Sequence, residues 1–466
     1  MGELLWMAGK AFLVAIVLTP IVRDLFRSYH MVDRPGKRKV HIYPIPRVGG
    51  IAIAIAYGVA LLTAPAAETA AAPAVWKLLP GAALVFLTGL LDDFFSLKPV
   101  FKIAGLVAAA SLVFFSGLHV GGLGGQPVAV WLDYLLTVFW LLLTSNALNL
   151  IDGLDGLCAG MGLVATLTLF GAAMLRHNLP LAHATFPLVG ALLGFLCYNI
   201  SPATVFLGDS GALLIGFLLG CYGMIWTQKA STLLSMLVPL LALSIPLLDV
   251  SLSVLRRFLR NQPIFSADRR HIHHRLLDRG FSTRQAVWVL YLFGTLAAAL
   301  ALLASSPLGG KSQVVVIVLF CVAAGIGIRQ LRYWEFDMVG QFLFRGGLKR
   351  ALDGRLRLER LTSELERVTD QKAWWTTLVE GARGLGMSEI RWIGLEGART
   401  ETLAPQTAPA WTFRVSLTDA ESIEVSGGVP DAASSLDLIG FAETARRTFQ
   451  ASRAATQPET TAAAKS

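Results

Sequence analysis

Charged residues are scarce in this sequence. Only 15% of its 466 residues are Asp, Glu, Lys or Arg, whereas 54% are hydrophobic, and the mean hydropathy is +0.60. This composition excludes a soluble enzyme of this length, whose surface would carry many more charged side chains. The net charge of +9 does not indicate a nucleic-acid partner, because the positions of the basic residues have another explanation, given below.

Cysteines are equally few. All four lie in apolar runs and show neither metal-ligand nor disulfide spacing, so we interpret them as small core residues. The first apolar run contains Lys10 and has no small-residue cleavage site before Arg23, which predicts a retained span rather than a cleaved signal peptide. The nucleophile elbow G-x-S-x-G is absent, although a serine nucleophile at Ser210 stays open.

Long apolar runs dominate the sequence instead. A helix needs about 20 apolar residues to cross a bilayer, and eleven runs approach this length. They are Leu4–Val22, Val48–Ala64, Val75–Leu91, Val100–Ser116, Val128–Thr144, Leu157–Leu175, His183–Tyr198, Leu207–Trp226, Leu233–Leu255, Ala286–Ser305 and Ser312–Ile328. The sequence therefore predicts an all-α polytopic membrane protein with about 11 transmembrane helices, formed by residues 1–328.

Lys and Arg residues predict the orientation of these spans. Seven lie in the first connection, from Arg23 to Arg47, and eight lie in the ninth, from Arg256 to Arg284, whereas the even-numbered connections have at most one each. Because Lys and Arg concentrate in cytoplasmic loops, we expect the odd-numbered connections to be cytoplasmic. The N-terminus is then outside, and the C-terminus is inside.

The composition changes after Ile328. Residues 329–371 are expected to form a linker, with an amphipathic stretch at the membrane surface and then a charged helix, Leu348–Val368. Residues 372–450 have the pattern of a small cytoplasmic α/β domain, and residues 451–466 that of a disordered tail. The expected elements of the small domain are helices at Ala373–Leu385 and Leu436–Phe449 and strands near Glu389–Gly394, Trp411–Ser416 and Ser422–Ser426.

Four polar clusters fall on odd-numbered connections. They are Asp92-Asp93, the stretch Asn146–Leu157, Asn199 with Gly208-Asp209-Ser210-Gly211, and His271-Ile-His273-His274-Arg275. Each has a simpler interpretation as a helix cap, a solvated helix end or, for the histidines, a zinc site. Ionisable groups at the edge of hydrocarbon are costly, however, so their gathering on one side predicts a single cytoplasmic site built from at least four loops.

These residue types suit phosphoryl chemistry. Carboxylate and carboxamide oxygens are ligands that Mg²⁺ prefers, and Arg and His are donors to a pyrophosphate. A site with carboxylates on one side and Arg and His on the other is typical of phosphoryl transfer. The sequence therefore predicts transfer of a phosphorylated group at the membrane surface, with a lipid as one substrate.

In their order, these motifs resemble the polyprenyl-phosphate N-acetylhexosamine-1-phosphate transferase family, from about Leu4 to Ile328. The matching motifs are Asp92-Asp93, Asn146-x-x-Asn149-x-x-Asp152-Gly-x-Asp155-Gly-Leu, Phe206-x-Gly-Asp209-Ser-Gly, His271-x-His273-His274-Arg275 and, in the first loop, Arg38-Lys-Val-His41-x-x-Pro44-Ile-Pro-Arg47-x-Gly49-Gly50. Members of this family transfer a sugar-1-phosphate from a UDP-amino sugar to undecaprenyl phosphate and release UMP. The resemblance implies a multi-pass protein of the bacterial inner membrane, with Mg²⁺ as cofactor, or Mn²⁺ in its place.

The resemblance also implies roles for individual residues. It assigns Mg²⁺ binding to Asp209, places Asp152 and Asn149 beside the metal and pyrophosphate, and gives Asp92, with Asp93 next to it, the activation of the lipid phosphate. It assigns stacking on uracil to Phe206, and further nucleotide contacts to Gly153, Leu154, Asp155 and Asn199. The residues implied to hold phosphates and sugar are Lys102, His271, His273, His274 and Arg275. Of all these, the ones expected to be catalytic are Asp92, Asp93, Asp152, His271, His273 and His274.

The histidine motif favours one branch of the family. The branch that uses UDP-N-acetylmuramoyl-pentapeptide has three consecutive histidines followed by an acidic residue, whereas this chain has His-x-His-His-Arg. It thus resembles the branch that uses UDP-N-acetylglucosamine or a related hexosamine. The muramoyl branch and, from a different class, a polytopic transporter remain as alternatives. A homodimer is left open, and Trp375–Gly394 bears a faint resemblance to a GAF-like regulatory domain.

Overall fold

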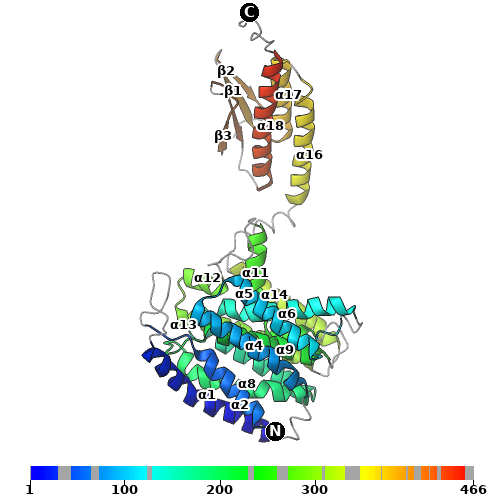
Figure 1. Cartoon of the computed structure of the whole chain (residues 1–466). Coiled ribbons are helices and arrows are strands. Elements are labelled where there is room, and N and C mark those ends of the chain that lie inside the picture. The colour runs from blue at the N-terminus through cyan, green and yellow to red at the C-terminus, as the bar shows by residue number, and fades with distance from the viewer. Residues whose placement is uncertain are drawn as a thin grey trace, which may run out of the picture. The chain divides into compact units, whose positions relative to one another are not determined.

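The chain forms two compact units, Met1–Leu331 and Arg332–Ser466 (Figure 1). The computed structural model describes residues 2–29, 44–64, 73–122, 128–228, 236–259, 271–306, 310–330, 347–368, 370–394, 397–403, 411–418, 420–427 and 432–456. Several sequence predictions lie outside these ranges: the first-loop motif before residue 44, the basic residues 269–270 and the expected surface segment after residue 330.

The described part of the first unit is built from helices joined by short connections. Its helices are α1 (Gly2–Ser28), α2 (Gly49–Leu62), α4 (Pro73–Phe95), α5 (Pro99–Phe115), α6 (Val130–Ile151), α7 (Leu157–Leu175), α8 (Leu179–Asn199), α9 (Gly208–Gln228), α10 (Leu237–Ala242), α11 (Ser244–Leu259), α12 (Ile272–Asp278), α13 (Thr283–Ser305) and α14 (Gly310–Gln330). Within the described ranges, eight helices are long and apolar enough to cross a membrane, and α2 and α5 are shorter apolar helices. A polytopic helical membrane protein is thus confirmed, while the count of eleven crossings stays a prediction.

The ninth apolar run differs from the single span expected for it. It is broken into α10 and α11, because Pro246 has no N–H to donate to the carbonyl of Ala242 and its ring would clash there. Helix α10 accordingly ends at Ala242 and α11 begins at Ser244. Asp249, in the first half of α11, bonds to His271 and Ile272 at the start of α12, which carries the histidine tract.

Helix α9 lies at the centre of the first unit. Almost all of it is buried, and it packs against α4, α6, α2 and α7. Glycines make this close packing feasible: a Cβ added at Gly216 would lie 2.5 Å from the carbonyl oxygen of Thr144 on α6. Small residues at helix interfaces let backbones approach in the same way in other membrane proteins. The first turn of α9 carries Asp209, so the packing of α9 positions that carboxylate.

Lys10, Asp133 and Asp249 are charged residues at inner positions of the apolar runs, and each has a partner. Lys10 on α1 donates to Thr63 at the end of α2, with 2.7 Å from Nζ to Oγ1 and 3.1 Å to the carbonyl oxygen. Asp133 on α6 accepts from the Gly121 N–H at 2.9 Å. Asp249 on α11 contacts α12, as described below. These charges are satisfied within the protein, which is the usual condition for a charge inside a membrane span.

The second unit is a small sheet with helices. Its elements are α16 (Gly347–Leu365), α17 (Gln371–Gly384), β1 (Glu389–Gly394), β2 (Gly397–Thr402), β3 (Trp411–Ser416), β4 (Ser422–Gly427) and α18 (Ala432–Thr456). The four strands are antiparallel in the order β2-β1-β4-β3. The core gathers Trp374, Trp392 and Phe449 with aliphatic side chains from α16, α17 and α18. Figure 1 shows the helices beside the sheet.

Two features of this unit differ from the expectation. Strand β2 was not predicted, because its residues Gly397–Thr402 are all exposed and lack an apolar alternation; it is held by pairing with β1. Helix α18 continues to Thr456, six residues into the segment expected to be disordered. Alanine favours helix over coil, which accounts for the extension.

Candidate active site

An ammonium group links the polar clusters at one end of the bundle. Lys102 on α5 donates to Asp92 Oδ2 at 3.0 Å and also contacts Asp209 Oδ2 directly. When the Asn149 amide nitrogen faces Asp209 Oδ1, at 3.3 Å, the Asn149 amide oxygen lies 3.0 Å from Lys102 Nζ. The three side chains around Lys102 come from the ends of α4, α6 and α9. Three of the four expected clusters therefore converge on one point.

Asp93 holds the beginning of α9. Its Oδ1 accepts from the Asp209 N–H at 2.7 Å, and its Oδ2 accepts from the Ser210 N–H at 2.9 Å. These N–H groups belong to the first turn of α9, where they have no partner within the helix, and a carboxylate there is further stabilised by the helix dipole. Gly208 has φ +77°, and a Cβ there would lie 2.8 Å from Asp93 Oδ2. Asp93 thereby sets the direction of Asp209.

Asp152 is the partly buried carboxylate that follows α6. Its burial, and next the negative charge of Asp209, raise the pKa of Asp152 to about 7, although the charge of Arg47 acts in the opposite direction. The next residue, Gly153, lies against the histidine tract, because a Cβ there would be 2.6 Å from His273 Nε2. The loop after α6 thus joins the carboxylate cluster to the fourth expected cluster.

Two side chains fasten this loop to the segment before α9. Asp155 Oδ2 accepts from the Ala203 N–H at 3.0 Å. Asn199 accepts from the Gly156 N–H at 3.2 Å and donates from Nδ2 to the Val205 carbonyl at 2.8 Å. Both groups of the Asn199 amide are therefore engaged with backbone. Its position beside the site agrees with the sequence prediction, while its bonds give it the task of joining two loops.

The first connection completes the rim of the site. Phe206 donates its N–H to the Pro46 carbonyl at 2.9 Å, and Gly49 donates to the Phe206 carbonyl at 3.0 Å. This parallel bridge between Arg47 and Phe206 places a cationic side chain near Asp152, where its charge opposes the effect of burial and of Asp209 on the pKa of that carboxyl. Leu154, by contrast, is only 7% exposed. A nucleotide contact at Leu154 would therefore have to use its backbone.

The histidine tract begins α12 and is largely buried. His271 Nδ1 lies 3.0 Å from Asp249 Oδ2, and the ring of His271 is parallel to that of His273 at 5.8 Å. His274 and Arg275 follow on the same short helix. Burial lowers the pKa of His273 to about 4, with the neighbouring His274 as the next cause. His273 is therefore a neutral imidazole at pH 7.

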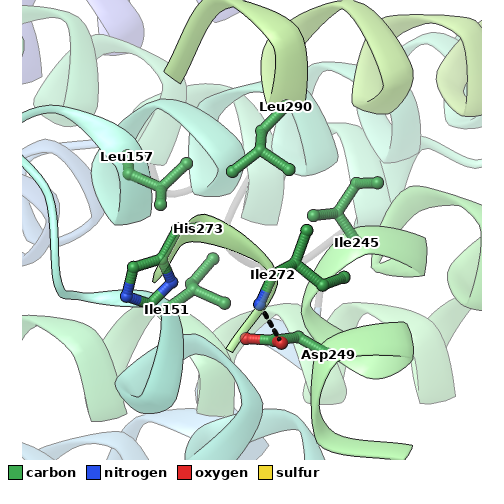
Figure 2. A pocket seen from close by; sticks show the side chains of 7 residues that line it. All are labelled: Ile151, Leu157, Ile245, Asp249, Ile272, His273 and Leu290. Carbon is green, nitrogen blue, oxygen red and sulfur yellow. Dashed lines mark hydrogen bonds between the residues drawn. The ribbon is translucent and has the colours of Figure 1, made fainter. Parts of the chain in front are cut away.

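A small cavity lies behind this tract. Figure 2 shows His273 and Asp249 beside it, together with Ile151, Leu157, Ile245, Ile272 and Leu290. Its volume is about 10 Å³, which is roughly the room that one water molecule needs. The Nδ1 atom of His273 is buried and has no partner among the described residues. The cavity belongs to the support of the site and is too small for a nucleotide sugar.

Two side chains of helix α13 donate hydrogen bonds to the same two loops. The Tyr291 hydroxyl donates to the Gly156 carbonyl at 2.6 Å, and a Cβ at Gly160 would overlap this hydroxyl. Arg284 donates to the Ser201 carbonyl at 3.0 Å. Sequence reasoning assigned no role to Tyr291, Arg284 or Asp249. No local pattern could have revealed these partners, since each lies more than 20 residues away.

The donors in the carboxylate cluster fit a hard divalent cation. Asp209, Asp92 and the Asn149 amide already surround a positive charge, that of Lys102, and Asp152 is close enough for its pKa to respond to Asp209. Within the described ranges, no three His, Cys, Asp or Glu side chains form a ready metal site. Mg²⁺ is commonly bound by one or two carboxylates together with substrate phosphates, and the cluster suits that arrangement.

Comparison with known proteins gives consistent matches. Residues 75–227 match the model of the family described as glycosyl transferase family 4. A probable undecaprenyl-phosphate N-acetylglucosaminyl 1-phosphate transferase of Bacillus subtilis (strain 168) is 32% identical over 314 residues, which are 66% of this chain and 87% of the relative.

Two further relatives carry similar names. A decaprenyl-phosphate N-acetylglucosaminephosphotransferase of Mycolicibacterium smegmatis is 33% identical over 62% of this chain and 79% of its own length. An undecaprenyl-phosphate alpha-N-acetylglucosaminyl 1-phosphate transferase of Escherichia coli (strain K12) is 31% identical over 63% of this chain and 82% of its own length. Both names contain N-acetylglucosamine and a polyprenyl phosphate.

Proposed function

Because this chain belongs to glycosyl transferase family 4, we propose that it transfers N-acetylglucosamine-1-phosphate, or a related N-acetylhexosamine-1-phosphate, from a UDP-sugar to undecaprenyl phosphate. UMP is the second product, and the lipid-linked sugar begins the synthesis of a cell-envelope glycopolymer. The names of the relatives support this donor and this type of acceptor.

One observation carries the proposal. Lys102, Asp92, Asp209 and Asn149 come from four separate helix ends and meet at one end of an apolar bundle. Ionisable groups at the edge of the membrane cost free energy, so a cluster of them there indicates a functional site. The membrane-embedded acceptor phosphate and the soluble donor nucleotide could both reach such a place, since it lies where the apolar helices end.

The reaction needs the acceptor and the donor in line. An oxygen of the lipid phosphate forms a bond to the β-phosphorus of the UDP-sugar, the bond from that phosphorus to the bridging oxygen breaks, and UMP leaves with the electron pair. A phosphate monoester has its second pKa near ~6, so the acceptor is mostly a dianion at pH 7. Asp92 then acts mainly by positioning Lys102. The positive charge of Lys102 relieves the repulsion between the lipid phosphate and the pyrophosphate of the UDP-sugar.

Mg²⁺, with Mn²⁺ as a substitute, is the cofactor that we propose for the carboxylate cluster. Asp209 and Asp152 would hold the ion, with Asn149 beside it. When bound, the ion would neutralise negative charge on the pyrophosphate. Lys102 is already paired with Asp209, so it would remain as the neighbouring donor to a phosphate oxygen.

The nucleotide is proposed to lie over the loops that follow α6 and precede α9. Gly153 is exposed and Phe206 is partly exposed, so both are accessible to a base. Asp155 and Asn199 hold the two loops together. The histidine tract adjoins this loop through His273, which lies against Gly153, and we propose that His271, His273, His274 and Arg275 face the phosphates and the sugar.

The two alternatives have less support. The relatives named above are N-acetylglucosamine enzymes, which favours that donor over the muramoyl-pentapeptide nucleotide. A transporter would need polar groups along a path through the bundle. Lys10, Asp133 and Asp249, the charged residues at inner positions of the apolar runs, are instead each engaged with a partner within the protein. We also propose that the cluster end is cytoplasmic in the bacterial inner membrane, as the basic loops predict.

The test is UMP release by the purified chain with Mg²⁺, undecaprenyl phosphate and several UDP-sugars. We expect release with UDP-N-acetylglucosamine, none with the muramoyl-pentapeptide nucleotide, and loss of release with EDTA. Asp209→Asn should lose nearly all turnover and its response to Mg²⁺. The control is Asp24→Asn, because Asp24 is exposed and pairs with the adjacent Arg23. Folded protein that releases no UMP with any UDP-sugar would refute the proposed function.

A further inference from the structure

Asp249 is a buried carboxylate with two bonds into the histidine tract. It is 2% exposed and lies on α11, 22 residues before His271. Its Oδ2 is 3.0 Å from His271 Nδ1, and its Oδ1 accepts from the Ile272 N–H at 2.8 Å. Figure 2 shows the second of these bonds at the edge of the small cavity. Both oxygens of Asp249 are thus directed at the first residues of α12.

The two bonds have different consequences. The bond to the Ile272 N–H satisfies an end group of α12 and fixes where that helix begins. The bond to His271 decides which ring nitrogen carries the proton, because a carboxylate accepts and does not donate. His271 must therefore be protonated at Nδ1. Its Nε2 is then the nitrogen left to interact with other groups, as a bare acceptor in the neutral ring or as a donor in the cation.

The ring of His271 is parallel to the ring of His273. Their centroids are 5.8 Å apart, and the angle between the ring planes is 6°. His273 in turn lies against Gly153 of the loop that follows α6. Carboxylates that orient an imidazole in this manner recur in catalytic and metal sites, where they select the tautomer and hold the ring.

We propose that Asp249 is a positioning residue of the transfer reaction, which fixes the Nδ1–H form of His271 and so presents Nε2 to the donor phosphates. This proposal rests on the proposed function. Asp249 touches neither substrate, so it acts only through His271 and the start of α12. A second His–Asp pair, His119–Asp133 at 2.6 Å, lies at the start of α6, whereas Asn149 of the carboxylate cluster lies near the end of that helix.

Two substitutions separate the bonds of Asp249. Asp249→Asn keeps an oxygen for the Ile272 N–H but turns an amide N–H toward His271, which forces the proton from Nδ1 to Nε2. Asp249→Ala removes both bonds. We expect each variant to lose about 10- to 100-fold in kcat, the range found when an orienting partner of a histidine is removed. The KM for UDP-N-acetylglucosamine should change less than kcat. Asp133→Asn, the matched control, should keep normal activity.

The tautomer itself is measured by ¹⁵N NMR on histidine-labelled full-length protein in lipid nanodiscs. The His271 signals are assigned by their loss in His271→Gln. We expect a protonated Nδ1 in the unmodified chain and a protonated Nε2 with bare Nδ1 in Asp249→Asn. A bare Nδ1 in the unmodified chain would overturn the proposal, and so would normal kcat in Asp249→Asn beside a loss in Asp249→Ala. Absence of UMP release from the unmodified chain would instead refute the proposed function, since the NMR result needs no turnover.

Discussion

The bond pattern of Asp93 leads to a prediction with a magnitude. Asp93 accepts two backbone N–H groups at 2.7 and 2.9 Å, from Asp209 and Ser210. A hydrogen bond to a charged group contributes about 1.5–3 kcal/mol. In Asp93→Asn one oxygen remains as acceptor, while the amide NH₂ faces the second N–H. The loss is therefore about 2–3 kcal/mol at the start of α9.

This loss translates into activity because Asp209 itself is one of the two N–H donors. Each 1.4 kcal/mol is a factor of ten in an equilibrium. If the whole loss of free energy falls on the orientation of Asp209, Asp93→Asn lowers the fraction of molecules with a correctly oriented Asp209 about 30- to 100-fold. Asp93→Ala leaves both N–H groups without a partner and should lose more.

The assay is UMP release at several Mg²⁺ concentrations, with thermal unfolding measured in parallel. We expect a 30- to 100-fold fall in kcat/KM for Asp93→Asn and a higher Mg²⁺ requirement. The control is Asp370→Asn, because Asp370 also caps a helix, accepting from the Ala373 N–H at 3.1 Å, but lies in the second unit. Activity within threefold of the unmodified chain would refute the capping argument. A loss above about 10⁴-fold at unchanged stability would show a chemical role instead.

Two further predictions concern the support of the site. His273 has a pKa of about 4 in the folded chain against an ordinary 6.5. Between these two pH values the unfolded state binds one more proton than the folded state, so the free energy of unfolding falls as the pH falls, by about 2 kcal/mol at pH 5. His273→Gln should therefore flatten the fall in melting temperature between pH 7 and 5, and an unchanged slope would contradict this prediction. Tyr291→Phe removes the bond to the Gly156 carbonyl, worth about 1 kcal/mol, and should raise the KM for the UDP-sugar about fivefold, whereas the exposed Tyr29→Phe should not.

Local patterns predicted the elements well where a helix is apolar over its whole length. A helix across a membrane must satisfy its own backbone and be apolar over its length, so the runs in α1, α4, α6, α7, α8 and α9 are visible in the sequence. The pattern failed where a strand or a helix end depends on its neighbours. Strand β2 is polar and exposed, and it exists because β1 pairs with it. The α10–α11 break depends on a single proline inside an apolar run.

The sequence predicted which residues belong to the candidate site better than it predicted the bonds between them. The sequence placed Asp92, Asn149 and Asp209 on the same side, and the structure brings them together around Lys102. It could not distinguish Asp92 from Asp93, although one pairs with Lys102 and the other holds α9. Likewise, Asn199 was expected at the nucleotide, but both groups of its amide bond to backbone.

By itself, the sequence determined that this chain is a helical membrane protein with one polar end, and which residues gather there, because apolar length and the order of the motifs are local properties. Only the tertiary structure decided what each residue does. Asp93 meets α9 across 116 positions, and Asp249 meets His271 across 22. Such partners are set by how whole helices pack, and helix packing depends on side-chain shapes along every interface at once.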